Sequence, residues 1–113
     1  MAERGDVLQL KRRIGFGRDQ EGERFVVVQA TALNSALPTM LVVPLDPHVA
    51  LFSSSPLAVR VSATEAGASA DHVAVSSWIH VLHLDRVVPG RVGRLKRATL
   101  DELDDRLRRV LDL

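Results

Sequence analysis

Short apolar runs recur along most of the chain at lengths typical of β-strands. They cover residues 6–10, 25–29, 40–45, 57–61 and 72–82, and most breaks between them contain Gly, Pro, Ser or Asn. Runs of this kind between turn residues favour a small barrel or compact sheet over a parallel α/β fold. We therefore predict a mainly β fold, in which residues 72–82 form one long strand.

Two segments have helical rather than strand spacing. Residues 31–37 predict a short helical turn that ends before Pro38, because a proline pushes the preceding residue out of the helical region. Residues 99–113 place leucines on one face, which predicts a C-terminal amphipathic helix. Thr99 and Glu102 have the spacing of a capping box, so we expect this helix to begin at Thr99.

Length and composition limit the kinds of protein that this chain can be. Its 113 residues suit one domain, spanning residues 1–113, with a single core. The absence of cysteine excludes disulfides and thiolate chemistry. No apolar run approaches the roughly 20 residues that cross a bilayer, so we expect a cytoplasmic protein without membrane contact. Its four histidines lack metal-ligand spacing, so we predict no metal and no cofactor.

Positive charge is concentrated in two places, although the net charge is only +1. The first basic run consists of Lys11, Arg12, Arg13 and Arg18, and the second basic run consists of Arg86, Arg91, Arg94, Lys96 and Arg97. If the fold brings both runs to one face, they form a groove that attracts phosphates. The alternative is two solvated surface loops.

Several short motifs also follow one another in a characteristic order. They are Arg4-Gly5-Asp6-Val7, Gly22-Glu23-Arg24-Phe25, Asn34-Ser35-Ala36-Leu37-Pro38-Thr39, Pro44-Leu45 and Gly90-Arg91-Val92-Gly93-Arg94-Leu95. With these motifs and the closing helix, the sequence resembles the MazF/PemK family of toxin endoribonucleases over nearly its whole length. The resemblance implies an SH3-like β-barrel of the PemK/MazF/CcdB type.

The resemblance also implies a function. The chain would be the toxin of a type II toxin–antitoxin system, a metal-independent, sequence-selective endoribonuclease that cleaves single-stranded mRNA through attack of the ribose 2′-hydroxyl. It would form a homodimer with an RNA cleft, and a cognate antitoxin would place its acidic tail in that cleft. The two basic runs would be the surface along which the RNA lies.

Arg24 is the first candidate catalytic residue. Cleavage without a metal needs a base, an acid and positive charge over the phosphorane. A guanidinium supplies the charge and a planar fork of donors that matches phosphate oxygens. In the family, the arginine after Gly-Glu is catalytic, which implies that role for Arg24. The competing interpretation is a strand-edge arginine that shields the apolar core.

Asp46 is the second candidate, at a position where family members usually carry Thr or Ser after Pro-Leu. A carboxylate beside a phosphate repels it unless the group acts as a base, is protonated or pairs with Arg24. Asp46 is therefore a remodelled base, a sign of lost activity, or a turn residue before Pro47 that hydrogen-bonds its own backbone. His48 lies close enough in sequence to serve as a spare acid.

A further departure from the family lies in the long strand. Many relatives read Asp-Gln-Ile-Arg where this chain has Ser77-Trp78-Ile79-His80. His80 can act as a cation, an acid or a base, because its unperturbed pKa lies near 6.5. Alternation predicts that Ile79 and Val81 face the core while Trp78 and His80 face outward or line a groove. Trp78 then stacks an RNA base, or it anchors the core or a dimer interface.

These substitutions motivate a second hypothesis from a different class. The chain would be a non-catalytic binding protein with the same fold, either a CcdB-like poison of a protein target or a degenerate toxin that still binds its antitoxin.

Overall fold

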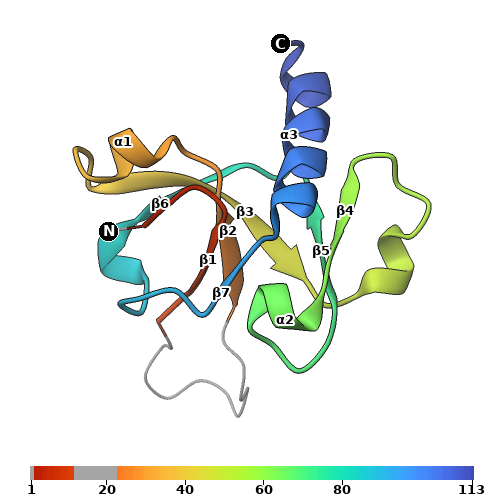
Figure 1. Ribbon diagram of the computed structural model, residues 1–113, viewed down its shortest axis with the longest axis horizontal. Coiled ribbons are helices and arrows are strands. Elements are labelled where there is room, and N and C mark those ends of the chain that lie inside the picture. The colour runs from red at the N-terminus through yellow and green to blue at the C-terminus, as the bar shows by residue number, and fades with distance from the viewer. Residues whose placement is uncertain (1, 12–22) are drawn as a thin grey trace.

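The computed structural model describes residues 2–11 and 23–113. Seven strands lie within these ranges: β1 (Asp6–Gln9), β2 (Arg24–Val27), β3 (Thr39–Asp46), β4 (Ala58–Val61), β5 (His72–Val75), β6 (His80–His83) and β7 (Gly93–Arg94). They form a curled antiparallel sheet in the order β4-β5-β3-β2-β1-β7, with β6 also paired to β3 (Figure 1). The predicted mainly β, barrel-like fold is confirmed.

Short helical segments connect the strands, and one long helix follows them. They are α1 (Thr31–Asn34), the 3₁₀ turns η1 (Val49–Phe52) and η2 (Leu84–Arg86), α2 (Ala63–Ala66) and α3 (Arg97–Leu111). α1 confirms the helical turn expected before Pro38, and α3 confirms the C-terminal helix. In the parts of the chain that the structure describes, no helix is long and apolar enough to cross a membrane.

The predicted long strand at 72–82 is wrong, because a turn divides it into β5 and β6. The backbone N–H of Trp78 donates to the carbonyl oxygen of Val75 at 2.9 Å and closes this turn. β5 pairs with the end of β3 at residues 45–46, and β6 pairs with its start at residues 39–42. Two short strands separated by a turn can follow the curl of β3. The residue types continue to alternate across the turn, so the sequence pattern does not indicate it.

Alternating side chains supply two cores, one on each face of the sheet. On one face, Val7, Val26 and Val43 pack with Leu103 of α3, and all four are fully buried. A second set of buried residues packs on the other face, close to η2; it consists of Leu8, Phe25, Val27, Met40, Val42 and Val87. The helix and η2 therefore close the sheet from opposite sides.

The start of α3 differs from the prediction. The helix begins at Arg97, two residues before Thr99, and its N-cap residue Lys96 has no capping side chain of its own. The backbone N–H of Lys96 instead donates to the Glu65 carboxylate at 2.9 Å. A buried acid from another element thus replaces the expected Thr99–Glu102 capping box.

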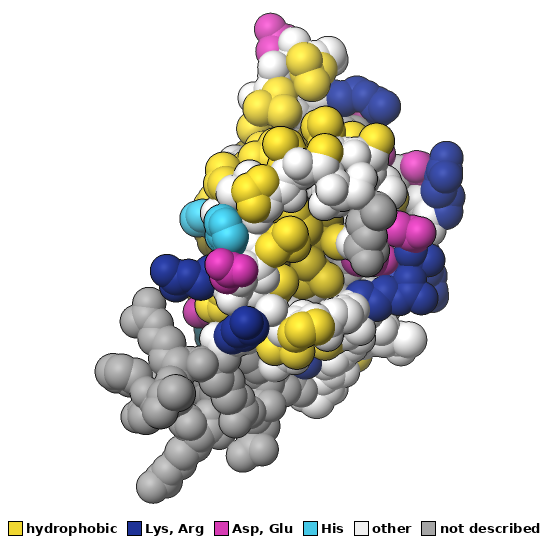
Figure 2. Space-filling view, turned by 90° about the vertical axis from the view of Figure 1, so that its left-hand side faces the viewer, with side chains coloured by type: hydrophobic (Ala, Val, Ile, Leu, Met, Phe, Trp, Pro, Cys, Tyr) yellow, Lys and Arg dark blue, Asp and Glu magenta, His cyan; other side chains and the backbone are white. Residues whose placement is uncertain are grey.

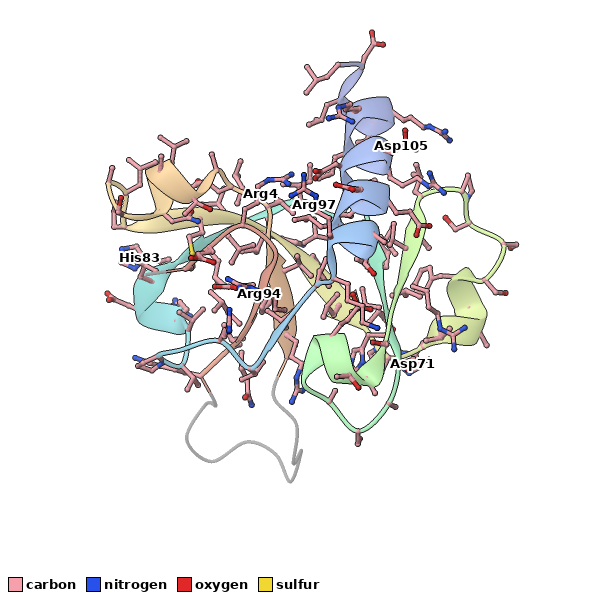
Figure 3. All side chains as sticks on the ribbon, viewed as in Figure 1. Arg4, Asp71, His83, Arg94, Arg97 and Asp105 are labelled. Atoms are coloured by element: carbon pink, nitrogen blue, oxygen red, sulfur yellow. The ribbon has the colours of Figure 1, made fainter. Side chains whose placement is uncertain are left out.

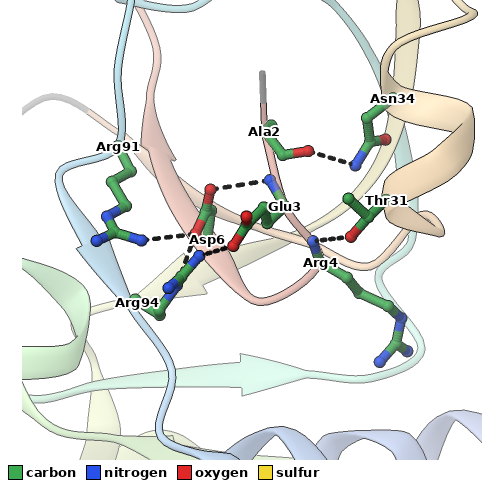
Figure 4. Close-up of polar contacts among 8 residues, drawn as sticks. All are labelled: Ala2, Glu3, Arg4, Asp6, Thr31, Asn34, Arg91 and Arg94. Atoms are coloured by element: carbon green, nitrogen blue, oxygen red, sulfur yellow. Dashed lines mark hydrogen bonds and ion pairs between the residues drawn. The ribbon is translucent and has the colours of Figure 1, made fainter.

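The N-terminal motif fastens the strands to the helices (Figure 4). Asp6 is buried, and its carboxylate accepts hydrogen bonds from the Glu3 backbone N–H at 2.9 Å and the Arg94 Nε–H at 3.0 Å. The Arg4 guanidinium donates to the carbonyl oxygen of Val28 and forms a two-pronged ion pair with Asp104 of α3. The motif therefore has a structural role in this chain.

Candidate nucleic-acid site

Arg24 is the first residue of β2 and is 7% exposed. The ladder with β1 places it opposite Gln9, and the next residue, Phe25, pairs with Pro44 of β3. Its Nη2 donates to the carbonyl oxygen of Gly67 at 3.0 Å. Because Arg24 is buried at the start of a strand, its side chain is held in one position, as a phosphate-binding arginine requires.

Asp46 lies at the neighbouring strand end but bonds His48 rather than Arg24. Phe25 pairs with Pro44, so the same register places Arg24 level with Leu45. The Asp46 Oδ1 accepts from the His48 backbone N–H at 2.7 Å and contacts its Nδ1 at 2.9 Å. The first contact is the turn hydrogen bond that one of the three interpretations of Asp46 expected.

The pair of contacts also orients the His48 ring. Because Nδ1 faces the carboxylate oxygen, which accepts, this contact is a hydrogen bond when Nδ1 carries the proton. His48 is exposed, whereas the Asp46 side chain is partly covered. This carboxylate–imidazole pair can accept or release a proton beside the strand end that carries Arg24.

Ser77 and Trp78 form part of the turn between β5 and β6. Both are exposed, Trp78 by 40%. The indole and the Phe52 ring of η1 form a T-shaped contact, with ring centroids 5.2 Å apart and planes at 88°. Trp78 is therefore a half-covered surface residue, which fits the outward orientation predicted for it.

His80 lines a groove of about 530 Å³ that runs across β2, β3 and β6. The groove has an apolar floor that includes Phe25, and its rim carries Glu23, His80, His83 and Arg86. Figure 3 shows His83 at the corner where β6 meets η2. We call this feature the β6 groove.

The expectation that Val81 lies in the core is wrong. Its side chain is 68% exposed, and its register partner Leu41 is 42% exposed. Both side chains therefore lie on an open part of the sheet. Ile79 is partly buried against the core, as predicted.

One residue of each basic run meets the other. The Lys11 backbone N–H donates to the carbonyl oxygen of Arg86 at 2.8 Å, which brings Lys11 to the rim of the β6 groove. The predicted RNA contacts Arg12, Arg13 and Arg18 lie outside the described residues.

Much of the second basic run pairs with acids. Arg94 and Arg91 both approach the buried Asp6, and the hydrogen bond that Arg94 donates to the Asp6 carboxylate raises the pKa of Arg94. Arg97 pairs with Asp101 at 3.3 Å. These pairs reduce the positive charge that the second basic run presents. Lys11 and Arg86 are therefore better placed than the paired arginines to attract a phosphate.

The sequence itself places these features in a known family. Residues 3–111 match the family model of the PemK-like, MazF-like toxin of type II toxin–antitoxin systems. The chain belongs to this family.

Solved structures of MazF proteins share its fold. An endoribonuclease from a mycobacterial species, in complex with its cognate antitoxin, is 19% identical with a TM-score of 0.74, over 99% of this chain and 94% of that chain. MazF from Deinococcus radiodurans is 17% identical with a TM-score of 0.74, over 99% and 97%. The Mycobacterium tuberculosis toxin MazF-mt6 is 13% identical with a TM-score of 0.75, over 96% and 97%. A search of curated proteins found no significant match.

The PemK-like fold of this chain also has a second hollow, on the face shown in Figure 2. It measures about 780 Å³ and is lined by the N-terminal segment and residues 84–91, with Asp6 and Arg94 at its edge. Hydrophobic side chains gather near the centre of this face, with charged side chains around them (Figure 2). Because Arg94 donates a hydrogen bond to Asp6, the charges at the edge of this hollow largely neutralise each other, and the β6 groove has more unpaired charge among the described residues.

Sequence patterns missed three contributors to these sites. Glu23 and His83 line the β6 groove, and Gly67 bonds Arg24. No local signal marks them, because strand pairing between distant segments brings them into place. Among the residues that the structure describes, no cluster of three or more His, Asp or Glu could hold a metal ion.

Proposed function

We propose that this chain is the toxin of a type II toxin–antitoxin system and cleaves single-stranded RNA as an endoribonuclease. The observation that carries the proposal is the match of residues 3–111 to the PemK-like toxin family. It is supported by a buried arginine at the start of β2, beside a strand end that carries a carboxylate–imidazole pair. The solved relatives include proteins described as endoribonucleases.

In the proposed reaction, the ribose 2′-hydroxyl attacks the adjacent phosphate without a metal. Arg24 directs its guanidinium at the phosphate and stabilises the charge that develops on the phosphorane oxygens. His48, oriented by Asp46, takes the proton from the 2′-hydroxyl and returns it to the departing 5′-oxygen. The O–P bond to the 2′-oxygen forms as the bond to the 5′-oxygen breaks, so the first product carries a 2′,3′-cyclic phosphate.

The β6 groove is the proposed path of the RNA. Its apolar floor suits a base, while His80 and Arg86 on its rim suit the backbone. Lys11 approaches the same rim through its bond to Arg86. Trp78 and Ser77 lie at the turn that leads into β6, where the exposed indole face can stack a further base.

The proposed partners follow from the relatives. An endoribonuclease from a mycobacterial species has been solved with its cognate antitoxin, and MazF from Deinococcus radiodurans with MazE, so we propose a cognate antitoxin for this chain. A homodimer and a cytoplasmic location belong to the same proposal.

Induced expression tests the function in cells. Wild-type protein should arrest growth and fragment cellular RNA, and Arg24→Ala should relieve both effects. Arg60→Ala is the matched control, because Arg60 is exposed on β4 and pairs with Asp71. Equal toxicity of wild type and Arg24→Ala, with intact RNA in both, would instead favour the non-catalytic binding protein.

A further inference from the structure

Arg24 is held by a residue that lies 43 positions away in the sequence. The acceptor is the carbonyl oxygen of Gly67, which ends α2 in the left-handed conformation with φ 63°. A carbonyl oxygen carries no net charge, so this bond orients the guanidinium without cancelling its charge. The position of α2 therefore affects the direction in which the Arg24 guanidinium points.

Close backbone packing fixes α2 on one side. A Cβ at Gly67 would lie 1.9 Å from the carbonyl oxygen of Val92, and a Cβ at Gly93 would lie 2.1 Å from the carbonyl oxygen of Glu65. Neither distance leaves room for a side chain. α2 and β7 thus pack backbone against backbone, which only glycine permits.

Glu65 fixes α2 on the other side. Its side chain is buried, and Oε1 accepts from the Ser62 backbone N–H and hydroxyl, both at 3.1 Å. Its Oε2 accepts from the Lys96 backbone N–H at 2.9 Å, where α3 begins. One carboxylate therefore joins the start of α2 to the start of the longest helix.

We propose that Glu65 is a positioning residue for Arg24. It holds α2 between β7 and α3, and the Gly67 carbonyl passes this constraint to the guanidinium. The inference rests on the proposed ribonuclease function, in which Arg24 contacts the scissile phosphate. When the Glu65 network is weakened, α2 shifts and Arg24 loses the orientation that stabilises the phosphorane.

Glu65→Gln is the informative variant. It keeps the side-chain size but turns one acceptor oxygen into an NH₂ group, which then faces a backbone donor. A misplacement of about 1 Å can cost 100-fold in rate, so we expect kcat to fall roughly 10- to 100-fold. KM should change less than about threefold, because the lost interaction belongs to the transition state.

Asp104→Asn is the matched control. It makes the same carboxylate-to-amide change on α3 and weakens the ion pair with Arg4, but no described contact joins Asp104 to Arg24. Its kcat should stay within about twofold of wild type, since the two sites do not couple. An equal loss of kcat in Asp104→Asn, at equal loss of thermal stability, overturns the proposal.

A double-mutant cycle tests whether Glu65 acts through Arg24. In the Arg24→Lys background, Glu65→Gln should lower kcat by less than about twofold, because the fork that it positions is already absent. A loss as large as in the wild-type background overturns the proposal.

A readout without RNA separates this inference from the proposed function. The Arg24 Nε–H signal in ¹⁵N–¹H NMR spectra, assigned by its loss in Arg24→Lys, should shift or broaden in Glu65→Gln and stay in place in Asp104→Asn. An unchanged signal in Glu65→Gln overturns the positioning role. If the wild-type protein cleaves no RNA, the proposed function fails, yet this signal still decides whether Glu65 positions Arg24.

Discussion

At the scale of single residues, local sequence predicts where a residue lies in its strand or turn better than it predicts the residue's long-range contacts. An arginine just before an apolar run is expected at a strand start, and Arg24 occupies that place. The turn interpretation of Asp46 depends only on the next two residues, and the observed bond to His48 agrees with it. The bond from Arg24 to Gly67 spans 43 positions and depends on the closed sheet, so no local pattern could reveal it.

The Asp46–His48 pair gives a prediction at this scale. If His48 transfers the proton, His48→Ala should lower kcat/KM roughly 100-fold at neutral pH. Asp46→Asn should cost less, because its amide oxygen still accepts the turn hydrogen bond from the His48 backbone. Cleavage assays from pH 5 to 8 check both variants.

Asp46→Thr places at this position the hydroxyl that the family resemblance implies, and it can contradict the proposed role of Asp46. A clear gain of activity in Asp46→Thr would show that the carboxylate harms the site and would contradict its role in orienting His48. The catalytic roles of Arg24, Asp46 and His48 stay predictions until such variants are measured.

At the scale of elements, periodicity locates strands but not the breaks and caps that depend on distant residues. The runs at 25–29 and 40–45 correspond to β2 and β3. The turn between β5 and β6 escaped prediction because its residues continue the alternation. α2 carried a readable signal, since Ser62 and Glu65 have capping-box spacing and form that box. The start of α3 depends on Glu65, 31 residues away from Lys96.

Acid should loosen the link between α2 and α3. Burial raises the pKa of Glu65, but hydrogen bonds from Lys96, Thr99 and Ser62 outweigh it and leave the pKa below the ordinary value of 4.5. A carboxylate with a lowered pKa stabilises the fold above its unfolded pKa, and this stability is lost as pH falls through the folded pKa.

Denaturant unfolding of wild type and Glu65→Gln should therefore differ most at pH 6–7 and converge as pH falls below about 4.5. The change in stability with pH tests the direction of the pKa shift. A difference that stays constant from pH 7 to pH 3 would show that ionised Glu65 contributes nothing to the fold.

At the scale of the whole molecule, the order of motifs predicted the family and the barrel-like fold, and the match over residues 3–111 confirms the family. Sequence alone left open whether the two basic runs share a face. The backbone hydrogen bond from Lys11 to Arg86 brings one residue of each run to the β6 groove, while Asp6 and Asp101 pair with other members of the second run. These ion pairs form only in the folded sheet, so a count of basic residues along the chain overestimates the positive charge on the surface.

The most direct test of the account is cleavage by the purified protein, free of antitoxin, in the presence of EDTA. Single-stranded RNAs of varied sequence should be cut to products ending in a 2′,3′-cyclic phosphate. A single 2′-deoxy substitution at the cleaved nucleotide should block the cut, and Arg24→Ala should lower the rate roughly 100-fold or more while Arg60→Ala does not. Intact RNA with the wild-type protein, or equal cleavage by wild type and Arg24→Ala, would contradict the account.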